Sequence, residues 1–372
     1  MSTDAPESSA WMRLLENRFQ VRRAIRVPRA ALGLSAVLRC WRGTRADCRV
    51  ALPAAVCHEV VVAVLASGCQ PIFCDVNPAS GLVEDPEWHR ARQLGADVAL
   101  VVHLYGNPAG TTGVRGIFAS PNCLLLDDAA QALGSQSPDG LAGSKGDVGL
   151  LSFGASKHIP AGNGALLFQN AEFADEVAAA VNPIAPTAES LRKELSVEFR
   201  SRLERARAEL RQRGTAAASS FVGLIDDLQP TLRVPAIPGM DGLILDSLRN
   251  YSRLAAERVM KARLWRDSLA GTGLEPVGMG DGCVPWRYVC RLPGADWALQ
   301  HALAEALRAG GMHVSNWYLP AHWFLPGAPS LRGIETLARE VFQFWIDGEA
   351  TRESILRSTD TVRRQMSRLS AA

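Results

Sequence analysis

Two apolar runs in the sequence each end in polar residues that can do chemistry. The leucine run 124–126 is followed by Asp128, and the run 148–151 is followed by Ser152 and, five positions later, by Lys157. In open α/β sheets, ligands bind at the carboxyl ends of the strands. If both runs are strands, their polar residues are candidates for one site.

Lysine is scarce in this chain, which narrows the search for amine chemistry. Lysine and arginine total 40 residues, of which four are lysines: Lys145, Lys157, Lys193 and Lys261. Arginine cannot supply a reactive amine because its guanidinium stays protonated. Lys145 lies in an expected loop, while Lys193 and Lys261 lie on charged helical segments. We therefore expect the reactive amine at Lys157.

Together these residues match the needs of pyridoxal 5′-phosphate (PLP). This cofactor forms a Schiff base with a lysine amine, and a carboxylate beside its pyridine nitrogen strengthens the ring as an electron sink. Hydroxyls and N–H groups at a helix N-terminus hold its phosphate. Lys157, Asp128 and Ser152 can fill these roles, and segment 33–36, which opens an early helix, can supply further phosphate donors.

Each residue taken singly also has a plain structural interpretation. Lysines are mostly exposed, so Lys157 can be a surface residue. Acids after strands often cap helices, so Asp128 can be an N-cap. Ser152 can satisfy a local backbone group. The combination is more specific than its parts.

The pattern along the chain predicts the elements that position these residues. Short strands are expected at 49–52, 71–74, 97–103, 123–126, 148–153 and 165–168, alternating with helices such as 59–67. Strands that alternate with helices indicate a parallel or mixed sheet covered on both faces. Farther on, we expect a helix at 247–270, a strand at 286–292, a helix at 297–309, a strand at 313–317 and a helix after 350.

At these motifs the sequence resembles the DegT/DnrJ/EryC1/StrS family of sugar aminotransferases. The matching segments are Val102-His103-Leu104-Tyr105-Gly106, Asp127-Asp128-Ala129-Ala130-Gln131-Ala132, Gly146-Asp147, Ser152-Phe153 with Lys157, and Gly162-Asn163-Gly164. The resemblance covers roughly residues 30–168 and is weaker over 240–360. It implies the type I PLP-dependent transferase fold, with a mixed, mostly parallel sheet flanked by helices and a smaller C-terminal α/β domain. We expect a lead-in over 1–28, a large PLP-binding domain over 29–240 and the smaller domain over 241–372.

The resemblance also implies roles for individual residues. Lys157 would be the Schiff-base lysine and the proton shuttle, Asp128 the partner of the pyridine nitrogen, and Gln131 a residue near the ring and its 3-hydroxyl. The family passes an amino group, usually from glutamate or glutamine, to the keto group of a nucleotide-linked sugar. Its members usually build the site from two subunits, so a homodimer is implied.

The residues expected to contact the cofactor's phosphate and the face of its ring match the family less well. The resemblance assigns the phosphate to Ser152 and to the backbone near Ser35 and Ala36. After Pro53 the family usually has an aromatic residue that stacks on the cofactor ring, which this chain lacks. Either His58 stacks there or another group covers the ring. The family's asparagine-containing loop that reaches the partner subunit cannot be located.

Several residues are candidates for substrate contacts. Tyr105 lies at a strand end, and Tyr318 and His322 lie in a segment that resembles the family's Tyr-x-Pro-x-His element. All three can also be packed core residues. Asn163 stands where the family usually has an acidic residue, so the substrate is less well defined than the cofactor.

Composition bounds the remaining function classes. The formal net charge is +2, so no broad basic field favours nucleic-acid binding. No run is long and clean enough to span a bilayer, and the N-terminus does not resemble a secretory signal. The eight cysteines form no CxxC pair, so we expect reduced thiols and no metal site. These features predict a cytoplasmic protein.

Four functions remain open, in order of preference. The first is a PLP aminotransferase acting on a keto sugar. The second is a PLP enzyme with another reaction type or a ketone outside the nucleotide sugars, such as a cyclitol. The third is a non-catalytic relative with a binding role. The last is a nucleotide-binding Rossmann protein, which the lack of GxGxxG after the first strand disfavours.

Overall fold

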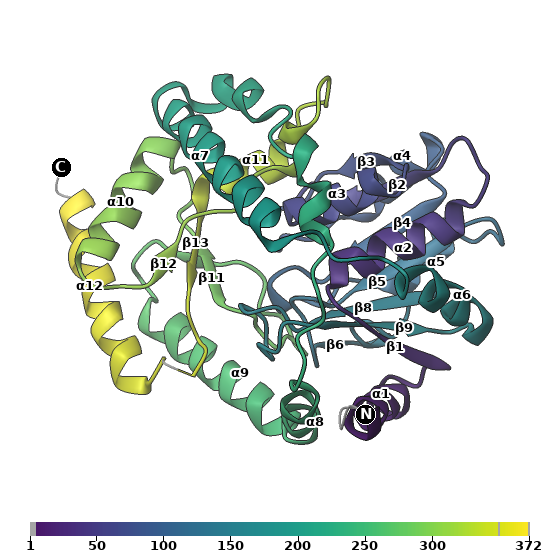
Figure 1. Ribbon diagram of the computed structural model, residues 1–372. Helices are drawn as coiled ribbons and strands as arrows, with labels where there is room; N and C mark the ends of the chain where they lie inside the picture. Colours follow the sequence, from purple (N-terminus) through teal and green to yellow (C-terminus); the bar gives the residue numbers. More distant parts are fainter. Residues whose placement is uncertain (1–4, 349, 371–372) are drawn as a thin grey trace.

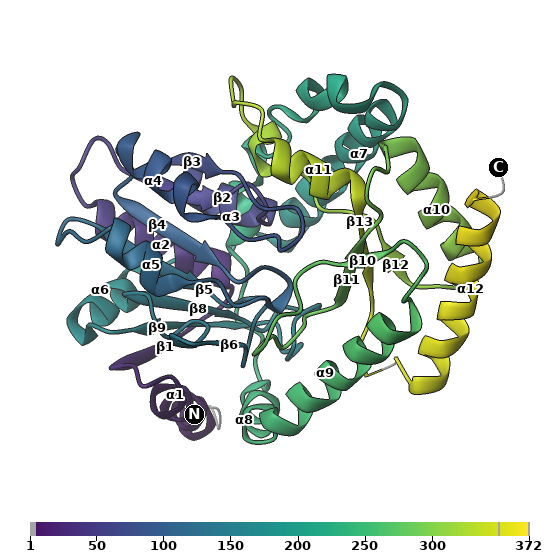
Figure 2. The ribbon, with the colours of Figure 1, turned by 180° about the vertical axis from the view of Figure 1, so that it is seen from behind.

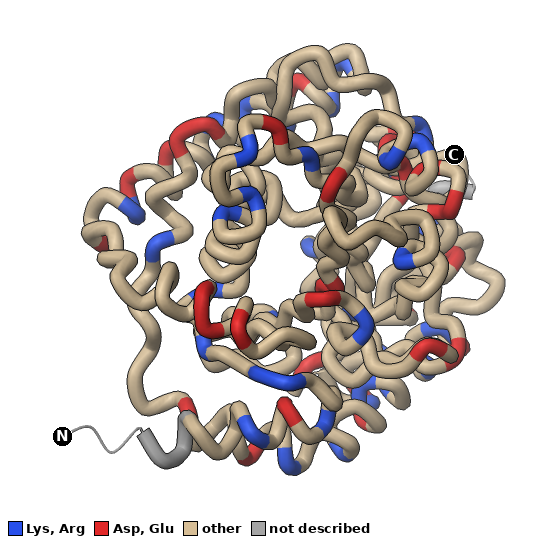
Figure 3. The backbone as a smooth tube through the Cα atoms, turned by 90° about the vertical axis from the view of Figure 1, so that its right-hand side faces the viewer, with Lys and Arg blue, Asp and Glu red and all other residues tan. Residues whose placement is uncertain are grey.

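The computed structural model describes residues 5–348 and 350–370. Its two main sheets lie side by side, each with its own helices (Figure 1). Basic and acidic residues are interspersed along the chain, and in Figure 3 neither sign gathers on one region. No helix in the described part is both long and apolar enough to cross a membrane.

The larger sheet has seven strands in the order β1-β9-β8-β5-β4-β2-β3. Strands β8, β5, β4, β2 and β3 run parallel, while β9 is antiparallel to both of its neighbours, β8 and β1. The bounds are β1 (Arg23–Val27), β2 (Arg49–Pro53), β3 (Gln70–Cys74), β4 (Val98–Val102), β5 (Leu124–Asp128), β8 (Val148–Ser152) and β9 (Gly164–Phe168). A short hairpin, β6 (Gln136–Ser137) and β7 (Gly140–Leu141), lies apart from this sheet.

Side chains along the central strands alternate between two covered faces, as the pleat requires. On β4, Val98 and Leu100 enter one apolar cluster, while Ala99 and Val101 enter another. The first cluster is covered by α2 (Ala30–Arg42), α3 (His58–Ala66) and α6 (Ala171–Val181). The second is covered by α4 (Asp85–Gln93) and α5 (Thr111–Ile117), which lie in front of the sheet in Figure 2. Helices α1 (Ala5–Phe19) and α8 (Asp241–Arg249) pack together beside β1 and β9.

The smaller sheet is antiparallel, in the order β10-β11-β13-β12. Its strands are β10 (Glu275–Pro276), β11 (Tyr288–Arg291), β12 (Val314–Ser315) and β13 (Val341–Phe344), and its helices are α9 (Tyr251–Ser268), α10 (Trp297–Ala309) and α12 (Arg352–Ser370). Trp265 of α9 stacks on Phe344 with ring centroids 4.7 Å apart, which fixes the helix on the sheet.

The remaining helices lie in the segments between these elements. They are η1 (Leu104–Gly106), α7 (Glu189–Arg213), η2 (Gly214–Phe221), η3 (Asp226–Leu232), η4 (Ala321–Phe324) and α11 (Arg332–Glu340). Helix α7 contacts α10 as well as η2 and η3, so it lies over both parts of the molecule (Figure 1).

The predicted α/β fold is confirmed, with differences in detail. Within the expected lead-in, residues 23–27 form β1, which pairs with β9 in the main sheet. The helix expected at 247–270 is interrupted at Asn250, where the backbone leaves helical geometry between α8 and α9. The strand expected at 286–292 starts at Tyr288, so Trp286 and Arg287 precede it. The division into domains at 28 and 240 stays a prediction.

Candidate active site

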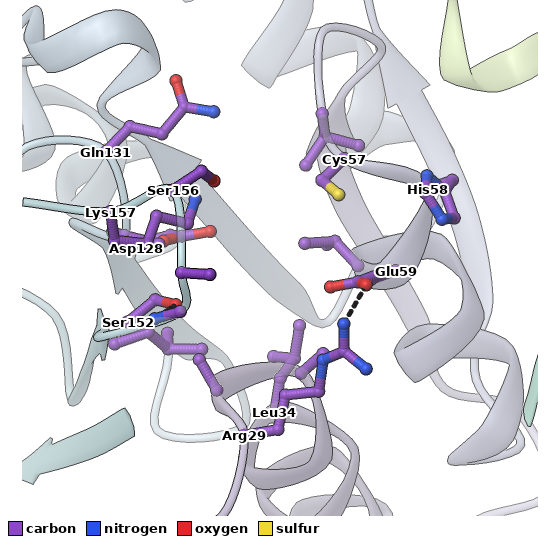
Figure 4. A pocket seen from close by; sticks show the side chains of 18 of the residues that line it. Arg29, Leu34, Cys57, His58, Glu59, Asp128, Gln131, Ser152, Ser156 and Lys157 are labelled. Carbon is purple, nitrogen blue, oxygen red and sulfur yellow. Dashed lines mark hydrogen bonds and ion pairs between the residues drawn. The ribbon is translucent and has the colours of Figure 1, made fainter. Parts of the chain in front are cut away.

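Strands β5 and β8 bring the two polar clusters of the sequence together. They are adjacent and parallel, with Asp128 paired to Leu150, so their carboxyl ends lie at the same edge of the sheet. Asp128 ends β5, Ser152 ends β8, and Lys157 follows in the turn after β8. All three line one cavity of about 790 Å³, together with Gln131. Figure 4 shows these four side chains along one wall.

Asp128 is a buried carboxylate at the cavity. It is 6% exposed, and its Oδ1 accepts a 2.8 Å hydrogen bond from the Ala130 N–H. No basic group of the described residues lies within 4 Å of it in an ion pair. Burial raises the pKa of Asp128, against the lowering effects of the Ala130 N–H and the nearby Lys157 charge. This carboxylate is therefore poorly compensated and would be stabilised by a cationic ligand.

The neighbouring acid, Asp127, points elsewhere and has a structural role. It accepts hydrogen bonds from His103 Nε2 at 2.5 Å and from the Lys145 N–H at 2.8 Å. The Ala109 N–H donates to His103 Nδ1 at 2.7 Å, so the proton of the neutral ring is on Nε2. This buried network anchors the loop that follows β4.

That loop carries Tyr105, which supports the cavity wall from behind. Tyr105 has φ +60° and is 2% exposed, and its N–H donates to Gln131 Oε1 at 2.9 Å. Its ring meets that of Tyr318 edge-on, with centroids 5.3 Å apart, and Tyr318 also hydrogen-bonds to Gln131. Tyr318 lines the cavity, whereas Tyr105 is not among the lining residues. Tyr105 therefore borders the cavity through Gln131 and Tyr318, and its predicted role towards substrate stays a prediction.

The N-terminus of α2 forms the floor of the cavity, and here the sequence prediction needs a correction. Ser35 and Ala36 were expected to donate to a phosphate, but both are buried in the interior of α2, where the helix uses their N–H groups. Ala30 and Ala31, in the first turn, line the cavity instead. Arg29, at the N-cap, forms an ion pair with Glu59 across the cavity (Figure 4).

The wall opposite Lys157 comes from the start of α3. In Figure 4 the thiol of Cys57 points into the space between the walls. His58 hydrogen-bonds to Cys57 and packs against Phe199, with ring centroids 4.8 Å apart. Both residues line the cavity, so stacking of His58 on a bound ring stays a prediction.

His322, a predicted substrate residue, is not among the residues that line the cavity. Its Nε2 lies 3.3 Å from Glu335 Oε1, and its ring packs edge-on against Phe73 and Trp323. It is 2% exposed and serves the packing of η4. The apolar residues that flank His322 in sequence are the feature that could have predicted its packing role.

Sequence reasoning did not single out several polar residues that line the cavity: Arg29, Cys57, Glu59, Ser156, Arg192, Ser315 and Gln343. Asn163 was noted only as a departure, yet it fixes a cavity-lining segment. Its Oδ1 accepts from the Ile237 N–H at 3.1 Å, and its Nδ2 donates to the Ile237 carbonyl at 3.3 Å. Partners 74 residues away in sequence leave no local pattern. No group of three or more metal-ligating side chains occurs within the described ranges.

Known proteins share parts of this sequence and its fold. A protein of Saccharopolyspora spinosa named dTDP-4-dehydro-2,3,6-trideoxy-D-glucose 4-aminotransferase is 28% identical over 119 residues, which are 32% of this chain and 31% of that protein. A protein of Streptoalloteichus tenebrarius named L-glutamine:2-deoxy-scyllo-inosose aminotransferase is 25% identical over 279 residues, 73% of this chain and 60% of its own length. The chain thus spans between about a third and three fifths of these two relatives.

A solved structure matches almost the whole fold. The Streptococcus pneumoniae sugar-aminotransferase-like protein Spr1654, in its PMP form, superposes with a TM-score of 0.77 over 98% of this chain and 92% of its own, at 16% identity. This likeness confirms the type I fold. The model of the DegT/DnrJ/EryC1/StrS aminotransferase family matches residues 2–208, more than half of the chain. The chain therefore belongs to the DegT/DnrJ/EryC1/StrS aminotransferase family.

Proposed function

We propose that this protein is a PLP-dependent aminotransferase that moves an amino group from glutamate or glutamine to the keto group of a nucleotide-linked sugar. One observation carries the proposal: Lys157, Asp128, Gln131 and Ser152, which the sequence singled out, line a single cavity. Family membership supports the enzyme class.

The residues present fit the cofactor. Asp128 is buried and has no ion-pair partner among the described residues, as expected for a carboxylate that pairs with a protonated pyridine nitrogen. The first turn of α2 offers free N–H groups at Ala30 and Ala31, which with the Ser152 hydroxyl suit a phosphate. The cavity of about 790 Å³ is large enough for a cofactor and a substrate.

Lys157 is the residue that we assign to covalent attachment and proton transfer. Its amine lies 5.6 Å from the ring centroid of Trp286, beside the Asp128 carboxylate (Figure 4). When bound, the cofactor supplies the electron sink that lets a Cα–H bond of the amino donor break. The Lys157 amine then accepts and returns the proton, as a general base and acid. Gln131, whose Oε1 accepts a hydrogen bond from the Tyr105 N–H, would help to orient the cofactor ring.

The relatives support a cyclic ketone, a keto sugar or a cyclitol ketone, as amino acceptor. One relative is named for a dTDP-linked keto sugar and the other for an inosose with glutamine as donor. A non-nucleotide ketone is the second candidate, because the inosose relative matches the larger share of this chain. The predicted homodimer and cytoplasmic location stay predictions.

The absorption spectrum tests the proposal. Protein incubated with PLP and then desalted should retain a yellow band that bleaches when glutamate or glutamine is added. Lys157→Ala should lose the covalent band, while Lys145→Ala, at a loop lysine outside the cavity, should behave as wild type. Wild-type protein that retains no cofactor, or whose band ignores every amino donor, would refute the aminotransferase assignment.

A further inference from the structure

A second cavity, of about 860 Å³, lies on the other side of the Lys157 turn. It is lined by α9, the start of α12 and the segment 311–313 as well as by this turn. Five residues line both cavities: Ala155, Ser156, Lys157, Trp286 and Arg287. The reactive lysine and Arg287 thus lie where the two spaces meet.

Arg287 is held rigidly at this junction. Its guanidinium carbon lies 4.1 Å from the ring centroid of Trp286 and 3.8 Å from that of Trp345. Nη1 donates to Gln343 Oε1 at 3.0 Å, and Gln343 is fixed by donating from Nε2 to the Trp317 carbonyl at 3.0 Å. Because the indoles contact the faces of the guanidinium, the edge nitrogens other than Nη1 remain for planar contacts with a ligand.

The guanidinium has no carboxylate partner in the described part of the chain. Asp347 attracts it, but no acidic oxygen lies within the 4 Å of an ion pair. Burial lowers the pKa of Arg287 to about 10, with Asp347 and Tyr105 acting in the opposite direction, so the group remains charged at neutral pH. Gln343 takes one of the five N–H donors of Arg287, so an arginine with its other donors beside a cavity and no acidic partner is suited to an anionic ligand.

The second cavity is lined by further charged and titratable groups besides Arg287. Lys261 is already neutralised, because it pairs with Glu257 at 2.7 Å. Arg258 donates to the Trp286 carbonyl at 3.0 Å and has no ion pair of its own within the described residues. His158 and His313 also line this cavity. The described acidic groups of this cavity are Asp347, which attracts both Arg258 and Arg287, and Glu257, which attracts Arg258 as well as Lys261.

We propose that Arg287 binds the anionic oxygens of the substrate beside Lys157, the carboxylate of the amino donor in the first place. This inference rests on the proposed function. Lys157 Nζ and the Arg287 guanidinium both lie over the ring of Trp286, at 5.6 Å and 4.1 Å from its centroid. A small amino acid that presents its Cα–H to the Lys157 amine therefore has its carboxylate within reach of Arg287. The phosphates of a nucleotide-linked acceptor also offer anionic oxygens. Experiments can distinguish the donor carboxylate from these phosphates.

The half-reaction with the amino donor, measured alone, distinguishes the donor carboxylate from the acceptor phosphates as the ligand of Arg287. In Arg287→Gln loaded with PLP, the rate of bleaching at low glutamate should fall roughly 10- to 150-fold, the range of a lost charge-assisted hydrogen bond, mainly through a higher KM. Arg287→Lys should recover part of the loss because it keeps the charge but not the fork. Arg266→Gln, at an exposed arginine of α9, should have no effect. An unchanged glutamate half-reaction in Arg287→Gln would refute the assignment to the donor.

A binding measurement makes the inference independent of turnover. Titration with glutarate, a dicarboxylate without an amine, should change the tryptophan fluorescence of the wild type and not of Arg287→Gln. Uridine diphosphate is the probe for the phosphate source. Loss of diphosphate binding alone in Arg287→Gln would transfer the contact to the acceptor, and equal binding of both probes to wild type and variant would overturn the inference. If wild type binds glutarate through Arg287 yet retains no PLP, the proposed function fails while this anion site stands.

Discussion

Replacing Asp128 by asparagine should affect cofactor binding and the stability of the cofactor-free protein in opposite directions. Asparagine has the same shape and keeps an oxygen to accept from the Ala130 N–H, which lies at 2.8 Å in the wild type. What is lost is the charge that would face the cofactor's pyridine nitrogen. A hydrogen bond to a charged group contributes about 1.5–3 kcal/mol, so PLP should bind roughly 10- to 150-fold more weakly.

Without cofactor, the same substitution should stabilise the fold. Burial raises the pKa of Asp128 above its ordinary value of 3.8, so the folded protein binds the proton more tightly than the unfolded chain. Stability is then lost as pH rises from 3.8 through the folded-state pKa, and the full penalty is present above it. Asp128→Asn removes this penalty at neutral pH. Its advantage should disappear below pH 3.8, where the aspartate is protonated in both states.

The assay is a PLP titration of wild type and variant, with urea unfolding of the cofactor-free proteins at neutral and acidic pH. Asp127→Asn is the matched control. It disturbs the hydrogen bonds from His103 and Lys145, so it should destabilise the fold by about 1–3 kcal/mol with a smaller effect on affinity. An Asp128→Asn protein with unchanged PLP affinity, or one less stable than wild type without cofactor at neutral pH, would contradict this reasoning.

Three further predictions concern the residues around the site. Asn163→Ala removes both hydrogen bonds to the Ile237 backbone and should lower the free energy of unfolding by about 1–3 kcal/mol in urea denaturation. An unchanged denaturation midpoint would show that these hydrogen bonds do not stabilise the fold. Cys57 faces the cavity, so bound PLP should slow its alkylation, measured by peptide mass spectrometry, and equal rates with and without cofactor would place PLP elsewhere. Gly106→Ala places a Cβ 2.3 Å from the Val284 carbonyl oxygen at a residue with φ +99°, so it should lower the free energy of unfolding by about 1–3 kcal/mol in the same denaturation. The control Gly110→Ala has open space around its Cβ and should leave the free energy of unfolding nearly unchanged. Equal effects of the two substitutions would contradict the close contact at Gly106.

The sequence was most informative where the fold is most regular. The leucine run before Asp128 and the run before Ser152 are central parallel strands, which are buried on both faces and therefore read as continuous apolar segments. Because parallel neighbours end at one edge, two local motifs were enough to bring Asp128 and Lys157 together. The same logic predicted β2, β3 and β4 to within about two residues at each end.

The sequence was least informative where long-range packing decides the structure. Strand β1 and strand β13 are short and gain their pairing from distant partners, and neither was expected. Ser35 and Ala36 were assigned to phosphate binding from the resemblance to the family, whereas the helix begins at Ala30, so its free N–H groups lie in the turn before them. The position of Arg287 between two indoles could not be predicted, because one indole, Trp345, is far from it in sequence.

Chemical trapping of the cofactor on the protein tests the central claim most directly. PLP-loaded protein is reduced with borohydride, which fixes an imine to a lysine irreversibly, and the digested peptides are then mapped by mass spectrometry. With four lysines in the chain, the outcome is unambiguous. We expect the pyridoxyl group on Lys157. Label on Lys145, Lys193 or Lys261 instead, or no label at all, would contradict the assignment of this cavity as a PLP site.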